Sequence, residues 1–226
     1  MEKKNCYPIV ETFLSIDGEG IRTGLPVVFV RFFGCNLRCA YCDTKYSYTN
    51  KKNVERTEYR QLSSEELTKE IMGYNCNRVT FTGGEPLLQK DYIKWFAESF
   101  PHIEINIETN GSLPISEFVN YKNVIITMDW KCESSKMSDE MFNDNLLKLR
   151  DNDVLKFVVG TDEDLIQSKN ILENYPLKSH IYFSPVFGQM DLEKLAQFVV
   201  DLRYYQKVRI GLQIHKIIWD PNQRGV

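Results

Sequence analysis

Short apolar runs recur along the chain, and amphipathic patterns separate most of them. The apolar runs, rich in β-branched and aromatic residues, cover positions 27–33, 78–81, 103–108, 124–128, 154–159, 181–183 and 208–213. Helical periodicity begins near position 63 and returns at 92–100, 139–149, 165–174 and 192–205. Because parallel strands need long crossover connections, this alternation predicts an α/β fold with a parallel sheet wrapped by helices, either open or a partial barrel.

The first of these helices carries a clear start signal. Ser63 and Glu66 have the spacing of a capping box, in which each side chain bonds the backbone N–H of the other residue. Leu67 and Ile71 follow on one helical face. We therefore expect a helix that begins at this pair and buries that face.

Polar or glycine-rich segments follow four consecutive predicted strands. They are the cysteine loop at 35–42, Thr82 to Pro86, Glu108 to Gly111, and Asp129 to Lys131. The carboxyl ends of parallel strands meet at one edge of the sheet, and ligands gather there. The four segments are therefore expected to form one site.

The cysteine loop contains Cys35, Cys39 and Cys42 in a C-x-x-x-C-x-x-C arrangement. Three thiolates can hold three corners of a [4Fe–4S] cube and leave the fourth iron open to a reactant. A structural zinc ion is the alternative, since zinc also binds clustered cysteines. A closed zinc site needs a fourth ligand, and none of the three histidines, His102, His180 and His215, belongs to a paired ligand motif.

Other single residues at this edge have two interpretations each. Arg31 lies inside an apolar strand, where a buried guanidinium needs either an anionic ligand or a structural salt bridge. Glu108 could accept hydrogen bonds from a ribose diol or be a solvated acid. Thr44 could bind a hard cation or be a turn residue. Gly83 and Gly84 allow backbone to approach a ligand closely, or form an ordinary tight turn.

Residues 15–20 are glycine-rich and acidic, but they do not match the G-x-G-x-x-G dinucleotide fingerprint. We expect a loop here, with no long strand before it. Residues 47–60 form a polar, Lys- and Asn-rich stretch that we interpret as a surface insertion.

Composition narrows the function classes. With 226 residues and 42% hydrophobic content, the chain is expected to form a single domain. A net charge of −3 provides no global field for nucleic acid or an anionic membrane. No apolar run approaches the roughly 20 residues that span a bilayer. The first residues lack a secretory apolar segment, so we expect a cytoplasmic protein with reduced thiols.

Together these segments resemble the radical S-adenosylmethionine (SAM) superfamily. The resemblance is carried by the cysteine triplet with Tyr41, by Gly-Gly-Glu-Pro at 83–86 and by Glu108. It implies a partial (β/α) barrel in which Cys35, Cys39 and Cys42 hold a [4Fe–4S] cluster whose open iron binds SAM. Reductive cleavage of SAM would then give a 5′-deoxyadenosyl radical.

Within that superfamily the chain is similar to the 7-carboxy-7-deazaguanine synthases over nearly its whole length. The similar segments are 15–20, 29–39, 42–44, 108–111, 155–156 and 215–226. The resemblance implies conversion of 6-carboxy-5,6,7,8-tetrahydropterin with loss of ammonia, on the route to queuosine, a tRNA modification, and other 7-deazapurines. It also implies a homodimer, an external electron donor such as flavodoxin or ferredoxin, and one domain over 1–226 with a tail at about 214–226 that closes the site.

The resemblance assigns roles to individual residues. Thr44 would bind Mg²⁺, which also contacts the substrate carboxylate. The residues implied at the SAM site are Tyr41, Gly84, Glu108, Asp129, Trp130 and Lys131. Those implied at the pterin are Ile16, Asp17, Gly18, Arg31, Thr82 and the terminal carboxylate of Val226.

Two positions depart from the family pattern. The usual glutamine of Ser-Ile-Gln-Gly-Glu-Gly is Asp17 here, and the usual Ser-Pro-Lys is Asp129-Trp130-Lys131. An aspartate only accepts hydrogen bonds, whereas a glutamine also donates them. Two alternative functions stay open at this point, a glycyl-radical-enzyme activase and a zinc-stabilised binding module without catalysis.

Overall fold

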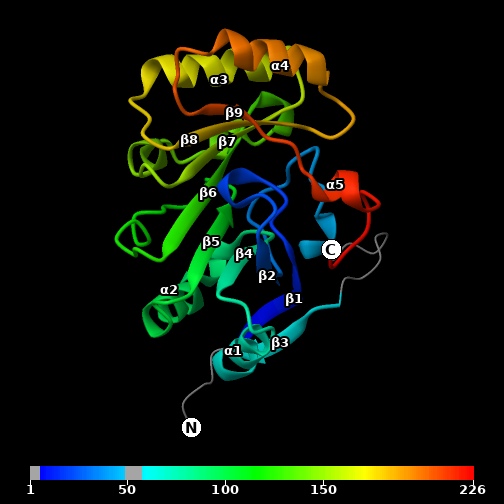
Figure 1. Cartoon of the computed structure of the whole chain (residues 1–226), viewed down its shortest axis with the longest axis vertical. Coiled ribbons are helices and arrows are strands. Elements are labelled where there is room, and N and C mark those ends of the chain that lie inside the picture. The colour runs from blue at the N-terminus through cyan, green and yellow to red at the C-terminus, as the bar shows by residue number, and fades with distance from the viewer. Residues whose placement is uncertain (1–5, 49–57) are drawn as a thin grey trace.

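A nine-stranded sheet forms the centre of the molecule in the computed structural model, which describes residues 6–48 and 58–226 (Figure 1). Its strands lie in the order β3-β1-β2-β4-β5-β6-β7-β8-β9. Their bounds are β1 Cys6–Ile16, β2 Pro26–Phe32, β3 Arg60–Ser63, β4 Arg78–Gly83, β5 Glu104–Thr109, β6 Val124–Lys131, β7 Val154–Val159, β8 His180–Pro185 and β9 Val208–Ile210.

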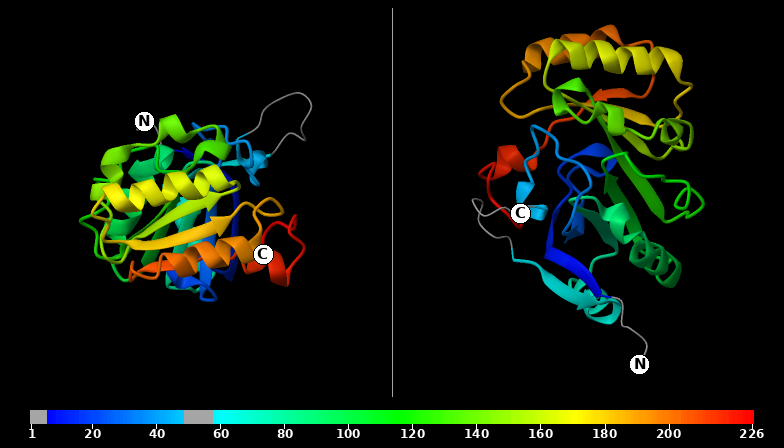
Figure 2. Two further views of the ribbon diagram at one scale, coloured as in Figure 1. Left: turned by 90° about the horizontal axis from the view of Figure 1, so that it is seen from above. Right: turned by 180° about the vertical axis from the view of Figure 1, so that it is seen from behind.

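From β2 to β9 all neighbouring strands are parallel, whereas β1 pairs antiparallel with both β2 and β3. The sheet does not close, since β3 and β9 are its two edges. The α-helices are α1 Ser64–Gly73, α2 Lys90–Ser99, α3 Asp162–Asn174, α4 Leu192–Asp201 and α5 His215–Ile218. Helices α1 to α4 lie around the outside of the curved sheet, and α5 lies on its open side (Figures 1 and 2). The prediction of a partial (β/α) barrel is confirmed.

The two faces of the parallel strands differ in chemistry. One face packs against the helices and buries side chains such as Phe32, Phe81 and Phe157. On β4, Thr80 and Thr82 flank Phe81 and point to the opposite face. Parallel strands buried on both sides normally carry continuous apolar runs. The alternation here therefore marks an inner face that is polar.

Helix positions follow the sequence signals closely in most cases. Ser63 caps α1, with its hydroxyl accepting from Glu66 N and its own N–H donating to the Glu66 carboxylate, and Leu67 and Ile71 are buried. Helices α2, α3 and α4 lie where periodicity predicts them. No helix in the described part of the chain combines the length and the apolar character needed to cross a bilayer.

The helix predicted over 139–149 is wrong. The chain forms two short 3₁₀ segments instead, Ser138–Glu140 and Asn143–Leu147. Asn145 explains part of the difference, because its amide donates to the carbonyls of Gly111 and Leu113 and accepts from Ile115 N. Side chains that bond backbone in this way compete with helix formation.

Strand β1 was also not predicted, and it lies directly before residues 17–20, where no long strand was expected. A register shift between Ile9 and Glu11 interrupts its alternation, so the period-2 signal is lost in the sequence. The predicted insertion at 47–60 is corrected at both ends, since Ser47 is buried and Arg60 begins β3. Residues 49–57 of that stretch lie outside the described residues.

Candidate active site

The cysteine loop leaves β2 at Gly34 and is held from two sides. The Gly34 carbonyl accepts from Glu85 N at 2.8 Å, and Ala40 N donates to the Ser135 carbonyl at 2.9 Å. A β-carbon at Gly84 would overlap the Gly34 carbonyl. The glycine at this position therefore permits close packing of the end of β4 against the cysteine loop, which is a contact between two protein segments.

The three predicted cluster ligands lie in distinct surroundings. Cys35 Sγ accepts from Leu37 N at 3.4 Å, and Cys42 Sγ lies 3.7 Å from the hydroxyl oxygen of Thr44. Burial raises the pKa of both Cys35 and Cys39, and the nearby ammonium of Lys131 opposes this at Cys39. Thiols in such surroundings become thiolates when a metal binds them.

Within residues 6–48 and 58–226, no three His, Cys, Asp or Glu side chains converge as ligands of a single metal ion would. A four-iron cube places different requirements on its ligands, because each thiolate binds a different iron and the sulfur atoms must stand apart. Three partly buried cysteines spread along one loop fit that donor set.

Beside the cysteine loop, two lysines and two carboxylates form a continuous ion-paired chain. Lys156 Nζ lies 2.6 Å from Glu19 Oε1 and 2.8 Å from Asp129 Oδ1, and Lys131 Nζ lies 2.6 Å from Asp129 Oδ2. Burial opposes ionisation, but the lysines hold the pKa of Asp129 below its usual range, and the carboxylates hold the pKa of Lys156 well above it. Asp129, Lys131 and Lys156 are therefore charged at neutral pH.

Glu108 is on the inner face of β5, the strand that lies between β4 and β6. Burial raises its pKa to about 7, and the negative charges of Asp17 and Glu19 act in the same direction. The ammonium of Lys156 and a hydrogen bond with Thr82 oppose the shift. A carboxyl group with this pKa can change its protonation state when a charged ligand binds nearby.

Asp17 is buried, and its side chain points toward Arg22. Asp17 Oδ2 lies 3.1 Å from Arg22 Nε, and Arg22 Nη2 donates to Thr80 Oγ1 at 2.9 Å. The backbone of Asp17 is also bonded, with its N–H on the Leu25 carbonyl and its carbonyl on Gly24 N. The aspartate that replaces the usual glutamine thus has a buried cation as its partner.

Arg31 forms a structural salt bridge, which is one of the two interpretations that the sequence allowed. Its Nε lies 2.7 Å from Glu11 Oε1 on the neighbouring strand β1. Its Nη1 and Nη2 atoms donate to no residue among 6–48 and 58–226. The guanidinium carbon of Arg31 lies 5.8 Å from the centroid of the Tyr46 ring. The guanidinium carbon of Arg224 lies 3.7 Å from the same centroid.

The tail reaches both loops of the site. Ile214 N donates to the Gly18 carbonyl at 3.0 Å, and a β-carbon on Gly18 would overlap the His215 ring. Lys216 Nζ lies 2.9 Å from Asp43, the residue after Cys42. Val226, at the far end of the tail, is partly buried.

Not every predicted residue points into this region. The Trp130 side chain is 5% exposed and lies in the core, on the face of β6 opposite Asp129 and Lys131. The Tyr41 hydroxyl lies 3.5 Å from the Val158 carbonyl oxygen, and Tyr41 interacts electrostatically with Lys131.

Sequence reasoning gave no role to Glu19, Lys156 and His215, although all three lie in the segments that resemble the family. Lys156 carried a signal, because a lysine inside the apolar run of β7 needs a buried anion, as Arg31 does. The contacts of Glu19 and His215 depend on how distant loops pack, which no local pattern indicates.

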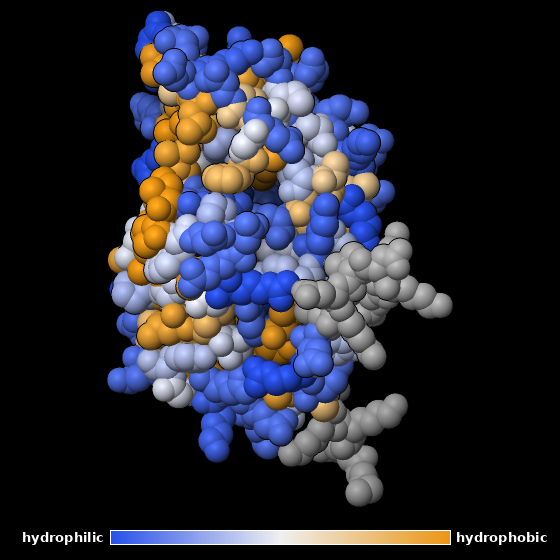
Figure 3. All heavy atoms as spheres, turned by 90° about the vertical axis from the view of Figure 1, so that its right-hand side faces the viewer, coloured by the Kyte–Doolittle hydropathy of each residue, from blue (hydrophilic) through white to orange (hydrophobic). Residues whose placement is uncertain are grey.

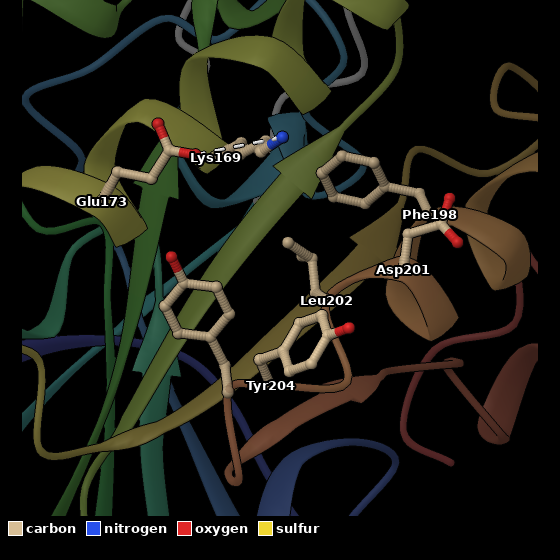
Figure 4. Close-up of a pocket in the computed structure, with 7 residues that line it drawn as sticks. Lys169, Glu173, Phe198, Asp201, Leu202 and Tyr204 are labelled. Carbon is tan, nitrogen blue, oxygen red and sulfur yellow. Dashed lines mark ion pairs between the residues drawn. The ribbon is translucent and has the colours of Figure 1, made fainter.

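Two surface hollows lie away from these residues. One lies between α3 and α4 and is lined by Lys169, Glu173, Phe198, Asp201, Leu202, Tyr204 and Tyr205 (Figure 4). The other is lined by Thr12, Arg60, Glu70, Gly73 and Tyr74. Neither contains a residue of the predicted site.

Comparison with known proteins identifies relatives of this chain. The sequence model described as "Radical SAM superfamily" matches residues 29–141. A 7-carboxy-7-deazaguanine synthase from Clostridium acetobutylicum is 41% identical over 225 residues, which cover 97% of this chain and 99% of the relative. The synthase from Thermoplasma acidophilum is 40% identical over 213 residues, covering 93% of this chain and 96% of the relative.

A solved structure shares the fold. The crystal structure of QueE from Escherichia coli superposes with a TM-score of 0.72 at 22% identity and covers 94% of this chain and 99% of that one. These relatives favour neither the activase nor the zinc module. The chain belongs to the radical SAM superfamily, whose members use a [4Fe–4S] cluster and SAM, and within it to the 7-carboxy-7-deazaguanine synthases.

Proposed function

We propose that this protein converts 6-carboxy-5,6,7,8-tetrahydropterin to 7-carboxy-7-deazaguanine with loss of ammonia, as a step toward queuosine and other 7-deazapurines. One structural observation carries the proposal beyond the names of the relatives. The tail contacts Gly18 through Ile214 and Asp43 through Lys216, and both contacts support a tail that closes the polar inner face beside the cysteine loop. A covered polar face suits a small charged substrate better than a protein segment.

The cofactor site would be built around the cysteine loop. Cys35, Cys39 and Cys42 would hold the [4Fe–4S] cluster, which together with SAM supplies a radical able to remove a hydrogen atom from the substrate. The groups that would line SAM are Tyr41, Gly84, Glu108, Asp129 and Lys131, with Trp130 contributing through its backbone. The paired charges of Asp129, Lys131 and Lys156 would orient the polar ends of SAM.

Substrate contacts would come from the opposite side of this space. Arg31 has its Nη atoms available for the pterin carboxylate while Nε stays on Glu11. Thr82 and the segment Ile16, Asp17 and Gly18 would contact the pterin ring. At Asp17 the backbone N–H and carbonyl already bond Leu25 and Gly24, and Oδ2 faces Arg22. The group left for the pterin is Oδ1, which is buried and has no hydrogen-bond partner among residues 6–48 and 58–226. A Val226 carboxylate at the pterin also stays a proposal.

A divalent cation would complete the site. Thr44 would offer its hydroxyl to Mg²⁺ beside Cys42, and the cation would also bind the substrate carboxylate. Its tasks would be to orient the carboxylate and to stabilise negative charge.

We further propose that residues 1–226 act as one catalytic domain, supplied with electrons by a flavodoxin or ferredoxin in the cytoplasm. A homodimer is part of the proposal. Helix α5 carries the exposed residues Ile217 and Ile218. Figure 3, which looks onto the side of the molecule where α5 lies, shows a strip of apolar side chains along one margin of that face. Exposed apolar patches often mark contacts between subunits.

The direct test is anaerobic incubation of the reconstituted protein with reductant, SAM, Mg²⁺ and the carboxypterin, with the product followed by mass. We expect 7-carboxy-7-deazaguanine from the parent and none from Cys39→Ala, which serves as the cluster-deficient control. Formation of 5′-deoxyadenosine without this product, from protein with a complete cluster, would reject the substrate and leave the radical SAM assignment intact.

A further inference from the structure

Asn110 lies directly beneath the cysteine loop, one residue after the end of β5. Its side chain is largely buried, and the amide nitrogen Nδ2 lies 3.7 Å from Cys35 Sγ. The same nitrogen donates to Asn36 Oδ1 at 3.1 Å. One amide hydrogen can thus point to the sulfur while the other bonds the loop.

The orientation of this amide follows from its other partner. The Asn110 Oδ1 atom accepts from Ser112 N at 3.0 Å and from Ser112 Oγ at 2.6 Å. A backbone N–H can only donate, so the atom that faces it must be the oxygen and the nitrogen must face Cys35. Asn36 Nδ2 donates to Ser112 Oγ at 2.8 Å and closes the ring of bonds.

The backbone around Asn110 is equally constrained. Asn110 N donates to Glu85 Oε2 at 2.7 Å, and Thr109 Oγ1 donates to Glu85 Oε1 at 2.8 Å. Gly111 adopts a φ of 79°, and a β-carbon there would lie 2.7 Å from the Asp129 carbonyl oxygen. Asn110 therefore has little freedom to move away from the sulfur.

We propose that Asn110 donates a hydrogen bond to the Cys35 thiolate and thereby raises the reduction potential of the [4Fe–4S] cluster. The proposal rests on the assignment of that cluster to Cys35, Cys39 and Cys42. An N–H donor stabilises the reduced cluster, which carries one more electron, more than the oxidised one. Among residues 6–48 and 58–226, Cys39 and Cys42 receive no N–H hydrogen bond on sulfur, whereas Cys35 receives two, from Leu37 and Asn110.

The test is an EPR-monitored redox titration of the reconstituted protein without SAM or substrate. Asn110→Asp keeps an oxygen for Ser112 but places an anion near the sulfur, so its midpoint potential is expected to shift to a more negative value. Asn110→Leu removes the donor without adding charge and is expected to shift it less, in the same direction. Asn36→Ala is the matched control, since it removes the other partner of Nδ2 and is expected to leave the potential unchanged.

Iron and sulfide analysis and far-UV circular dichroism accompany each titration. Unchanged potentials in both Asn110 variants, at full iron content, would overturn the proposal. Loss of the cluster in both variants with the fold intact would also overturn it, because Asn110 would then be a residue that supports the loop and not one that tunes the cluster. The parent protein separates this proposal from the proposed function, since its titration requires no turnover of carboxypterin.

Discussion

Lys156 Nζ lies 2.6 Å from Glu19 Oε1, and 137 residues separate the two in the chain. The contact joins the middle of β7 to the loop that follows β1. Because Lys156 also pairs with Asp129, one ammonium holds together a loop near the expected pterin and a strand end near the expected SAM. Electrostatics thus couple the two halves of the site.

Replacing Lys156 with methionine should destabilise the protein strongly. Glu19 would lose its cation and Asp129 one of its two, and breaking a buried pair by removing one partner costs about 3–5 kcal/mol. Urea denaturation of the apoprotein measures the change. Lys169→Met is the matched control, since its pair with Glu173 is half exposed at 3.9 Å and should contribute less than about 1 kcal/mol. Equal losses in the two variants would contradict the prediction.

The Asp17–Arg22 pair should show strong coupling. Asp17→Leu removes the buried carboxylate partner of Arg22 and leaves it with the more exposed Glu104, 3.4 Å from Nη1, so it is expected to cost about 3 kcal/mol of unfolding free energy. Adding Arg22→Met should recover part of that loss, because the second change removes a buried cation that has lost its nearest carboxylate. A double-mutant cycle from urea denaturation gives the coupling. Simple additivity of the two single changes would refute the pairing.

Stability should fall as the pH rises from about 4.5 to 7. Burial raises the folded-state pKa of Glu85 to about 7 from an ordinary 4.5, although three hydrogen-bond donors oppose the shift. The folded state therefore binds more protons than the unfolded state in this window, and a shift of that size corresponds to about 3 kcal/mol. Glu85→Gln should flatten the dependence, measured by urea denaturation at pH 5, 6 and 7. Burial also raises the pKa of Glu108 to about 7, so the unfolding free energy of Glu85→Gln should still fall somewhat with rising pH.

Thr44→Ala tests the proposed cation. The variant should retain its cluster and bind SAM, because the contact that is lost is a 3.7 Å approach of the Thr44 hydroxyl to Cys42 Sγ. Its Mg²⁺ dependence should change, with roughly 10–100-fold weaker activation by the cation. Titrating Mg²⁺ into the turnover assay measures this effect. Full activation at the parent's Mg²⁺ concentration would exclude Thr44 as a ligand.

Gly18→Ala tests the closing tail. Its new methyl group would overlap the His215 ring, so the tail should shift from the loop and KM for the carboxypterin should rise, with activity falling by up to about 100-fold. Faster proteolysis within residues 214–226 would report the shift independently of turnover. Gly73→Ala is the control, because no atom lies within 4 Å of the added β-carbon. An unchanged KM in Gly18→Ala would argue against closure by the tail.

Local patterns in the sequence were sufficient for most of the fold. The seven predicted strands all form, and the capping box at Ser63 lies at the start of α1. The cysteine triplet and the polar segments after β4, β5 and β6 were also predictable as neighbours on one edge, from their positions at strand ends. Each of these signals depends on residues within a few positions of one another, and parallel topology then brings the strand ends together.

The tertiary structure decided which partner each charged side chain has. Asp17 turns to Arg22 and Arg31 to Glu11, and both pairs depend on where the loop after β1 and strand β1 itself pack. Trp130 is a further example that local patterns do not settle. Its ring is buried on the helix side of β6, so Asp129 and Lys131, on either side of it in the chain, face the site instead. Sequence alone determined which chemical groups reach this edge of the sheet. Their pairing was decided by the packing of segments far apart in the chain, because ion pairs and hydrogen bonds depend on distances that no local pattern specifies.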